Sequence, residues 1–295
     1  MIQPCFNFTY TCKNNSYYWA LFFFLGIPFG TAQWTQKKGT GYYKLGAWFL
    51  EADQHYTNEG LLDPNATRGI FVTSLYGRHG ITDKITLVGY IPFTLVYQNE
   101  QIFTSGNPDQ PGEAVNSLGD IDLGVEFQLL KRPKWVLPTS LTLGIPSENN
   151  SGGSDGSYQT GDGEFNQILK VLVGTSFKIA KHSFYAKGSV GVNNRSNGYS
   201  DEIRLGFETG FQVFKNKFLL LVRLNTIQSF YNGSLSAENS NGSIFVNNVE
   251  VTNLGGEINY FLTKKWSASS GCSVPLSGKN IYKAPALAGG IAYKL

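Results

Sequence analysis

Twelve ionisable side chains in this chain occupy alternate positions of segments that are otherwise largely apolar. In residues 119–130, Asp120, Asp122 and Glu126 share one parity, and the apolar residues share the other. Successive side chains of a strand point to opposite faces, so such a segment has one charged and one apolar face. Both signs of charge occur in the full set: Lys44, Arg78, Asp120, Asp122, Glu126, Lys170, Lys187, Glu202, Arg204, Glu208, Arg223 and Glu257.

Opposed acids and bases of this kind suit two roles. In the first role they line a narrow passage, and the electric field across it decides which solutes pass. Alternatively, they would pair with one another and fill the interior. The sequence leaves both alternatives open.

Other chemistry finds little support in the residue pattern. Nucleophilic catalysis needs a His within hydrogen-bond reach of the nucleophile. Of the three His residues, His55, His79 and His182, none has a Ser two positions away on the same face, and the adjacent His182 and Ser183 point to opposite faces. We therefore expect no enzyme and no cofactor.

A metal site is also not expected. Asp155, Asp162 and Glu164 lie in a Gly- and Ser-rich stretch that lacks the ordered ligand spacing of a calcium loop, so we interpret it as a flexible surface loop. Cys5 and Cys12 fall in the amino-terminal segment, which leaves Cys272 alone and excludes an internal disulfide or thiolate cluster in the remainder.

About twelve alternating segments carry these residues, each near the ~9 to 11 residues that a tilted strand needs to cross a bilayer. Tight polar turns alternate with long loops rich in Gly, Ser and Asn, with both ends of the chain on the short-turn side. This pattern predicts an all-β fold, a transmembrane antiparallel up-and-down β-barrel of about 12 strands, with lipid outside. The predicted strands are 39–50, 70–81, 85–98, 119–130, 135–146, 166–179, 182–193, 201–214, 217–230, 249–262, 265–275 and 286–295.

Composition narrows the class of protein further. Charged residues make up 15% of the 295 residues, below the roughly 25% of ordinary domains, yet the mean hydropathy is −0.17. Such values exclude a helical membrane protein. The net charge of +3 without a basic cluster argues against a nucleic-acid partner.

The two ends of the chain carry targeting patterns. An apolar run over residues 17–29, followed by small residues, predicts a secretory signal peptide at 1–32 with the barrel at 33–295. The last six residues read Gly-x-x-aromatic-x-apolar, which looks like the terminal-strand signal recognised by the barrel-assembly machinery, with Leu295 in place of the usual Phe. Both features indicate the outer membrane of a Gram-negative bacterium.

Three stretches together resemble an outer-membrane family associated with the meta-cleavage pathway of phenol degradation. They are Gly-Ile-Thr-Asp-Lys-Ile-Thr-Leu at 80–87 with Ile-Pro-Phe at 91–93, Ser-Leu-Gly-Asp-Ile-Asp-Leu-Gly at 117–124, and Leu-Gly-Ile-Pro at 143–146 with Thr-Gly-Asp-Gly at 160–163. The resemblance covers roughly residues 70–180. It implies a transporter-like barrel for small hydrophobic or aromatic compounds.

We therefore expect a monomeric outer-membrane channel or transporter for the passive passage of small-molecule solutes. Two alternatives stay open: a structural or secretion-accessory barrel, and an outer-membrane phospholipase-type enzyme using Ser and His at the lipid-facing surface.

Overall fold

A computed structural model describes residues 35–64, 66, 68–100, 111–147, 151–154, 156–180, 182–236 and 244–295. The predicted signal peptide at 1–32, with Cys5 and Cys12, lies outside the described residues, as does Asp155. The signal peptide therefore stays a prediction. No helix long and apolar enough to cross a membrane occurs among the residues that the structure describes.

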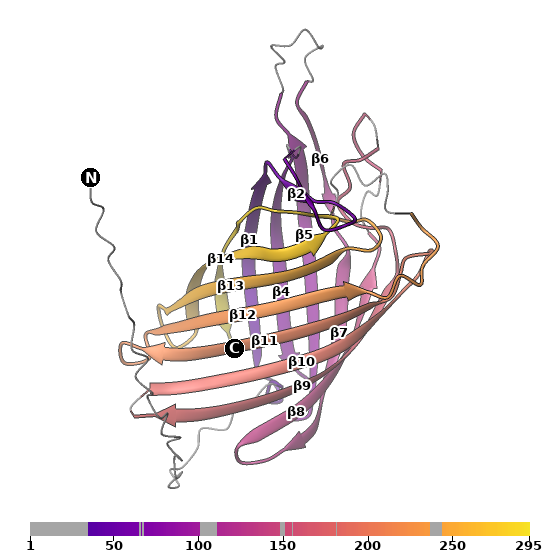
Figure 1. Ribbon diagram of the computed structural model, residues 1–295. Coiled ribbons are helices and arrows are strands. Elements are labelled where there is room, and N and C mark those ends of the chain that lie inside the picture. The colour runs from indigo at the N-terminus through magenta and orange to yellow at the C-terminus, as the bar shows by residue number, and fades with distance from the viewer. Residues whose placement is uncertain are drawn as a thin grey trace, which may run out of the picture.

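Twelve antiparallel strands close into one barrel, which confirms the predicted fold (Figure 1). Closure comes from β1 (Gly41–Ala52), which pairs with β4 (Arg68–Gly80) on one side and with β16 (Ala286–Lys294) on the other. From β4 the barrel continues through β5 (Ile85–Gln98), β7 (Ile121–Lys131), β8 (Trp135–Ile145), β9 (Asn166–Ile179), β10 (His182–Arg195), β11 (Glu202–Val213), β12 (Phe218–Ser229), β13 (Glu250–Phe261) and β14 (Trp266–Lys279) back to β16.

The barrel wall is interrupted at residues 119 and 120. The strand predicted over 119–130 is observed as β7 and begins at Ile121, and residues 113–118, which the sequence assigns to a long loop, form a strand before it. A further strand, β6 (Glu113–Leu118), pairs with one half of β5, and β7 pairs with the other half. Pro92 of β5 lies opposite this break and has no N–H to donate to the ladder. Gly119 fits there because a Cβ would come within 3.0 Å of the Thr160 carbonyl oxygen. Asp120 consequently lies between two strands and not within one.

The exterior of the barrel is apolar. Along β7, the side chains of Leu123, Val125, Phe127 and Leu129 point outward and are 40–52% exposed, whereas Glu126 and its parity partners face inward. The same division holds on β11, where Phe207 is exposed and Glu208 is buried. A closed barrel leaves no unpaired strand edge, and an apolar exterior requires hydrocarbon around it.

The two ends of the barrel differ, as the predicted loop lengths require. The short-turn end holds the connections 81–84, 132–134, 214–217 and 262–265 and the one between β9 and β10, and the long-loop end holds the others. In barrels of this topology the short-turn end faces the periplasm and the long-loop end faces the outside.

The long loops have structure that the sequence did not predict. Three two-residue strands, β2 (His55–Tyr56), β3 (Leu62–Asp63) and β15 (Ile281–Tyr282), form a separate small sheet at the long-loop end. Beside it lies a cluster of buried apolar side chains that joins the loops to the inner face of β1, β4 and β5. Its members are Leu50, Ala52, Ala66, Ile70, Val96, Tyr158, Tyr282, Ala284 and Ala286.

Candidate functional site: the interior of the barrel

A chain of five charged side chains, contributed by five strands, lies on the inner face of the barrel. Arg223 donates to Glu208 (Nε to Oε2, 2.6 Å) and to Glu257 (Nη1 to Oε2, 2.9 Å). Lys187 Nζ lies 2.9 Å from Glu208 Oε1, and Lys44 Nζ lies 3.9 Å from Glu257 Oε1. Strand register explains most of these pairs, because Lys187, Glu208 and Arg223 are direct neighbours across β10, β11 and β12.

The opposite wall carries a second pair and two tyrosines. Arg78 of β4 reaches across β5 to form an ion pair with Glu126 of β7. The rings of Tyr42 and Tyr76 meet edge to face, with centroids 6.4 Å apart.

A cavity of about 610 Å³ opens between these walls toward the short-turn end. Arg78, Lys187, Glu208, Arg223 and Glu257 line it, together with Tyr42, Tyr185 and residues 35–40. Five of the twelve predicted residues therefore share one cavity.

The segment that precedes β1 enters this cavity, which the sequence did not predict. The side chain of Thr35 is buried and donates from Oγ1 to Gln128 Oε1 at 2.8 Å. The N–H of Gln36 donates to Thr86 Oγ1 at 2.7 Å. Residues 35–40 have no alternating pattern, so the sequence gives no signal of this position.

The remaining predicted residues lie nearer the long-loop end. Asp122 lies on β7 and Lys170 on β9, and Arg204 of β11 donates to Glu202 at 2.7 and 2.9 Å. Asp120 accepts a hydrogen bond from the N–H of Asp162 at 3.3 Å.

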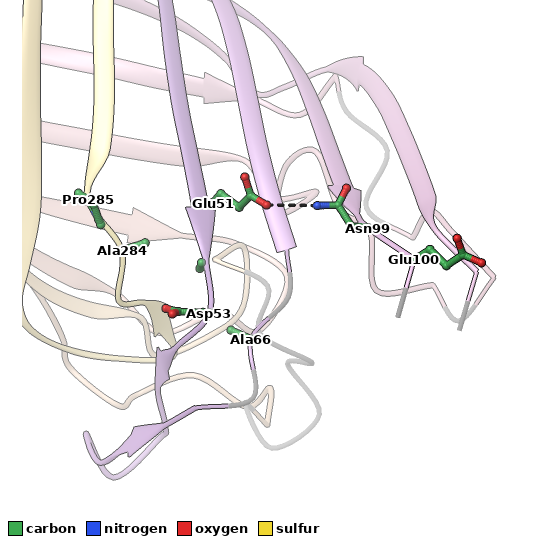
Figure 2. Close-up of a pocket in the computed structure, with 8 residues that line it drawn as sticks. Glu51, Asp53, Ala66, Asn99, Glu100, Ala284 and Pro285 are labelled. Atoms are coloured by element: carbon green, nitrogen blue, oxygen red, sulfur yellow. Dashed lines mark hydrogen bonds between the residues drawn. The ribbon is translucent and has the colours of Figure 1, made fainter. Parts of the chain in front are cut away.

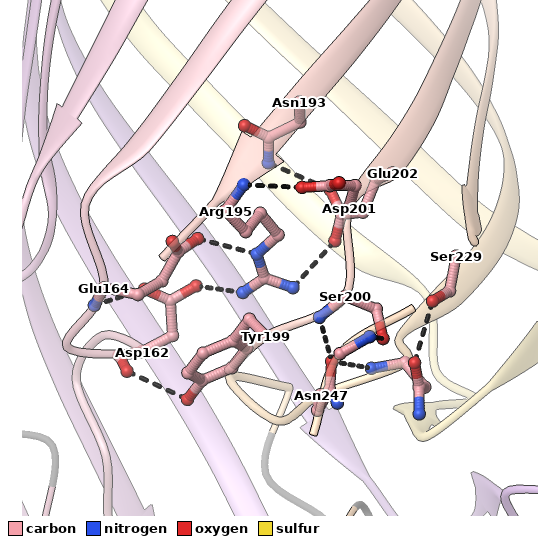
Figure 3. A network of polar contacts seen from close by, with 12 residues as sticks. Asp162, Glu164, Asn193, Arg195, Tyr199, Ser200, Asp201, Glu202, Ser229 and Asn247 are labelled. Atoms are coloured by element: carbon pink, nitrogen blue, oxygen red, sulfur yellow. Dashed lines mark hydrogen bonds and ion pairs between the residues drawn. The ribbon is translucent and has the colours of Figure 1, made fainter. Parts of the chain in front are cut away.

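Arg195 organises the long-loop end and was missing from the sequence-based set. Its guanidinium binds three carboxylates: Glu164 (Nε to Oε1, 2.6 Å), Asp162 (Nη2 to Oδ2, 2.6 Å) and Glu202 (Nη1 to Oε1, 3.0 Å). Figure 3 shows these side chains converging from one loop and two strands, with Arg195 over the ring of Tyr199 at 4.3 Å. We call Arg195, Asp162, Glu164 and Glu202 the arginine clasp. The interpretation of this stretch as a flexible surface loop is therefore wrong for Asp162 and Glu164, whose carboxylates are held by a guanidinium inside the protein.

The arginine clasp is almost excluded from solvent. The side chains of Arg195 and Glu164 are 5% and 0% exposed. Burial raises the pKa of Asp162 to about 6, against the opposing effect of the neighbouring Arg195 cation. Burial also raises the pKa of the Tyr199 phenol to about 12, and its hydroxyl donates to the Asp162 carbonyl at 2.9 Å. Three carboxylates around one guanidinium leave an excess of negative charge, which favours protonation of one of them.

A second, open pocket of about 550 Å³ lies at the long-loop end near β1 and β5 (Figure 2). Glu51, Asp53 and Glu100 give its lining an acidic character, and Asn99 Nδ2 donates to Glu51 Oε1 at 3.2 Å. Within the described part of the chain, no group of three or more His, Cys, Asp or Glu side chains is arranged to hold a metal ion.

The histidines make contacts other than those of a catalytic triad. His79 Nδ1 lies 2.7 Å from the Tyr43 hydroxyl, and His182 Nδ1 lies 3.2 Å from the Gln212 carbonyl oxygen. His55 belongs to the small sheet of the long-loop end. These contacts tie each ring to neighbouring structure and give no support to the phospholipase alternative.

The closed barrel, its apolar exterior and its charged interior together define an outer-membrane β-barrel, and they place the protein in the bacterial outer membrane. No family model and no curated protein sequence matches the chain.

Solved structures of the same class do match. The chain is similar to the COG4313 outer membrane channel from Pseudomonas putida F1, with a TM-score of 0.61, 14% sequence identity and coverage of 90% of this chain and 98% of that one. Two weaker likenesses are to the beta domain of the Bordetella autotransporter BrkA (TM-score 0.49, 15% identity, 88% and 100% coverage) and to the NanC porin (0.46, 8%, 85% and 100%). At these identities, the first likeness supports the barrel fold.

Proposed function

We propose that this protein is an outer-membrane channel for the passive passage of small molecules. The observation that carries the proposal is the cavity of about 610 Å³ inside the barrel, lined by cations and anions from facing walls. Charged side chains so placed act on a solute that passes between them. The similarity in fold to an outer membrane channel is consistent with this role.

In this proposal the twelve predicted ionisable residues line the path of the solute. Those of the cavity form the part of the path that opens toward the short-turn end, where Arg78 and Glu208 line the same cavity. Asp122, Lys170 and Arg204 follow toward the long-loop end. Passage through that end requires the loops held by the arginine clasp and by the apolar cluster to move aside.

The solutes proposed are small hydrophobic or aromatic compounds. The resemblance of residues 70–180 to the family associated with phenol degradation supports this range of solutes. So do the tyrosine rings of Tyr42, Tyr76 and Tyr185 on the inner face of the barrel, since aromatic rings pair favourably with one another.

Planar-bilayer conductance of the purified, folded protein tests the proposal. Steady currents that scale with the number of inserted barrels are expected. Electrical silence together with hydrolysis of the lipid would favour the phospholipase alternative, and silence alone would favour a plugged or accessory barrel. A barrel with Arg223→Gln should insert equally well and conduct with an altered ratio of cation to anion permeability, because Arg223 joins two acids of the cavity.

A further inference from the structure

Exposed lysines gather at one side of the short-turn end of the barrel. Lys215 and Lys217 lie in the connection between β11 and β12, Lys264 and Lys265 in the connection between β13 and β14, and Lys294 at the end of β16. We call these five residues the lysine arc. Within the described residues, none of the five forms an ion pair. They are dispersed along the sequence, and closure of the barrel brings them together.

Strand pairing makes the lysine arc continuous. β12 pairs with β13 and β14 pairs with β16, so the two connections and the end of β16 are neighbours on the rim. The N–H of Phe261 donates to the Lys217 carbonyl oxygen at 2.9 Å, and the N–H of Lys294 donates to the Lys265 carbonyl oxygen at 2.7 Å. Backbone hydrogen bonds therefore hold the five cations in one row. Asp83 is the one acidic side chain in the described connections of this end.

The opposite end of the barrel carries the opposite charge. Lys283 is the one cation in the described connections between barrel strands at the long-loop end. The acids of these connections include Asp53, Glu59, Glu100 and Asp201. The overall net charge of +3 conceals this separation. The excess of lysine is therefore a property of the short-turn end and not of the loops in general.

A band of aromatic rings lies on the outer face beside the lysine arc. Phe214 and Trp266 are 75% and 47% exposed. Trp266 packs against Tyr293, and Phe218 packs against Tyr260, each with ring centroids 4.9 Å apart. Such rings lie at the level of the head groups in a bilayer. Most of them are sequence neighbours of an arc lysine, whose long side chain can extend to the lipid phosphates.

Cations beside a lipid-facing aromatic band are suited to anionic phospholipids, because basic residues at a membrane surface attract negatively charged head groups. The same combination occurs on the opposite side of the rim, where Lys131, Arg132 and Lys134 precede Trp135, which is 40% exposed. A protein partner would contact one sector of the rim, whereas lipid surrounds all of it. The repetition therefore favours lipid over an acidic protein.

We propose that the lysine arc binds the head groups of anionic phospholipids in the leaflet that faces the periplasm. The barrel would then gather such lipids around its short-turn end. This inference goes beyond the proposed function and does not depend on it, because the head groups bind outside the barrel whatever passes through its interior.

Electron paramagnetic resonance of spin-labelled lipids tests the proposal on the folded barrel in phosphatidylcholine vesicles. The probes are trace amounts of phosphatidylglycerol or phosphatidylcholine, each spin-labelled on an acyl chain, and the immobilised fraction of each measures its association with the barrel. At low salt, phosphatidylglycerol should associate about fivefold more strongly than phosphatidylcholine, the increment for one cation near a head group. Added salt should reduce this preference.

Two matched variants test whether the charge of the lysine arc carries the preference. Replacing Lys215, Lys217, Lys264 and Lys265 together by Gln should lower the preference to about half, because the cations of the opposite sector remain. Replacing the same four residues by Arg keeps their charge and should preserve the preference. Lys279→Gln combined with Lys283→Gln removes two cations from the long-loop end and should also preserve it. Heat-modifiable mobility on gels verifies that every variant is folded.

Equal association of the two lipids with the wild type at low salt would overturn the proposal and leave the lysine arc to an acidic protein. An undiminished preference in the Gln variant would also overturn it, as would an equal loss in the Arg variant. Failure of the channel shows separately, since a barrel that passes no solute in a liposome-swelling assay contradicts the proposed function whichever lipid it prefers.

Discussion

Leu123→Arg places a cation on the lipid-facing wall of the barrel. The resulting loss in the free energy of unfolding depends on how deep residue 123 lies in the bilayer. The exposed apolar row of this wall runs from Leu118 on β6 to Leu129 near the end of β7, and Leu123 lies near its middle. Its side chain is 48% exposed on the outer face of the barrel wall, as expected for a residue in contact with lipid. An arginine at the bilayer midplane costs about 2 to 4 kcal/mol, falling to about 0 to 1 near the interfaces.

Leu129→Arg is the matched control for this prediction. Leu129 is 52% exposed on the same strand and the same face, but it lies two residues from the short-turn end of β7. Reversible denaturant unfolding in phospholipid vesicles should give a loss of about 2 to 4 kcal/mol for Leu123→Arg and about 1 kcal/mol or less for Leu129→Arg. Equal losses, or a larger loss for Leu129→Arg, would refute the placement of this wall in the bilayer.

Three further predictions concern the interior and the loops. Asp122→Asn should leave unfolding within about 0.5 kcal/mol of the wild type, because Asp122 has no ion-pair partner in the described chain, and should change the ratio of cation to anion permeability in bilayers. Arg195→Gln leaves the Asp162 and Glu164 carboxylates without the cation that binds them, while Glu202 keeps Arg204. The substitution should cost about 3 to 5 kcal/mol of loop stability, seen as faster hydrogen exchange in residues 196–201, and unchanged exchange would contradict the clasp. Burial raises the pKa of Asp162 to about 6, above the roughly 3.9 of an unfolded aspartate. The contribution of Asp162 to stability is therefore complete below about pH 4 and is lost as the pH rises through 6. Thermal unfolding of the wild type should show this loss of stability, and thermal unfolding of Asp162→Asn should not.

The strands and turns could be predicted from the sequence because period-two alternation is a local property of the chain. For β9, the predicted limits of 166–179 coincide with the observed ones, and for β5 the same holds at 85–98. Both strands end at polar turn residues, where the alternation stops. The strand β6 was missed because its six residues are too few for a clear period to appear at the end of a long loop.

The contacts inside the barrel could be predicted only in part. Parity identifies which side chains share a face, but the neighbours of each one depend on strand register and tilt, which bring Arg78 to Glu126 across an intervening strand. Arg195 was missed because the predicted strand ended at residue 193 and two of its three partners, Asp162 and Glu164, lie in a loop. Two-residue strands such as β2 are too short for any period to appear.

The sequence does not decide between an open and a filled barrel interior. The structure shows a cavity toward one end and packed loops at the other. Ion pairs such as Lys187 with Glu208 line a cavity without filling it, toward the short-turn end. At the long-loop end, Tyr158 and Tyr282 pack into the apolar cluster. The arginine clasp holds the loop between β8 and β9 against β10. Loop movement is therefore the step that controls passage in the proposed channel.

Conductance of single folded barrels in planar bilayers tests the central claim most directly. A passive channel predicts steady, ohmic current steps whose ratio of cation to anion permeability changes in Asp122→Asn and Arg223→Gln. A folded, inserted barrel that carries no current, both as the wild type and after loosening of the loops by Arg195→Gln, would contradict a channel role.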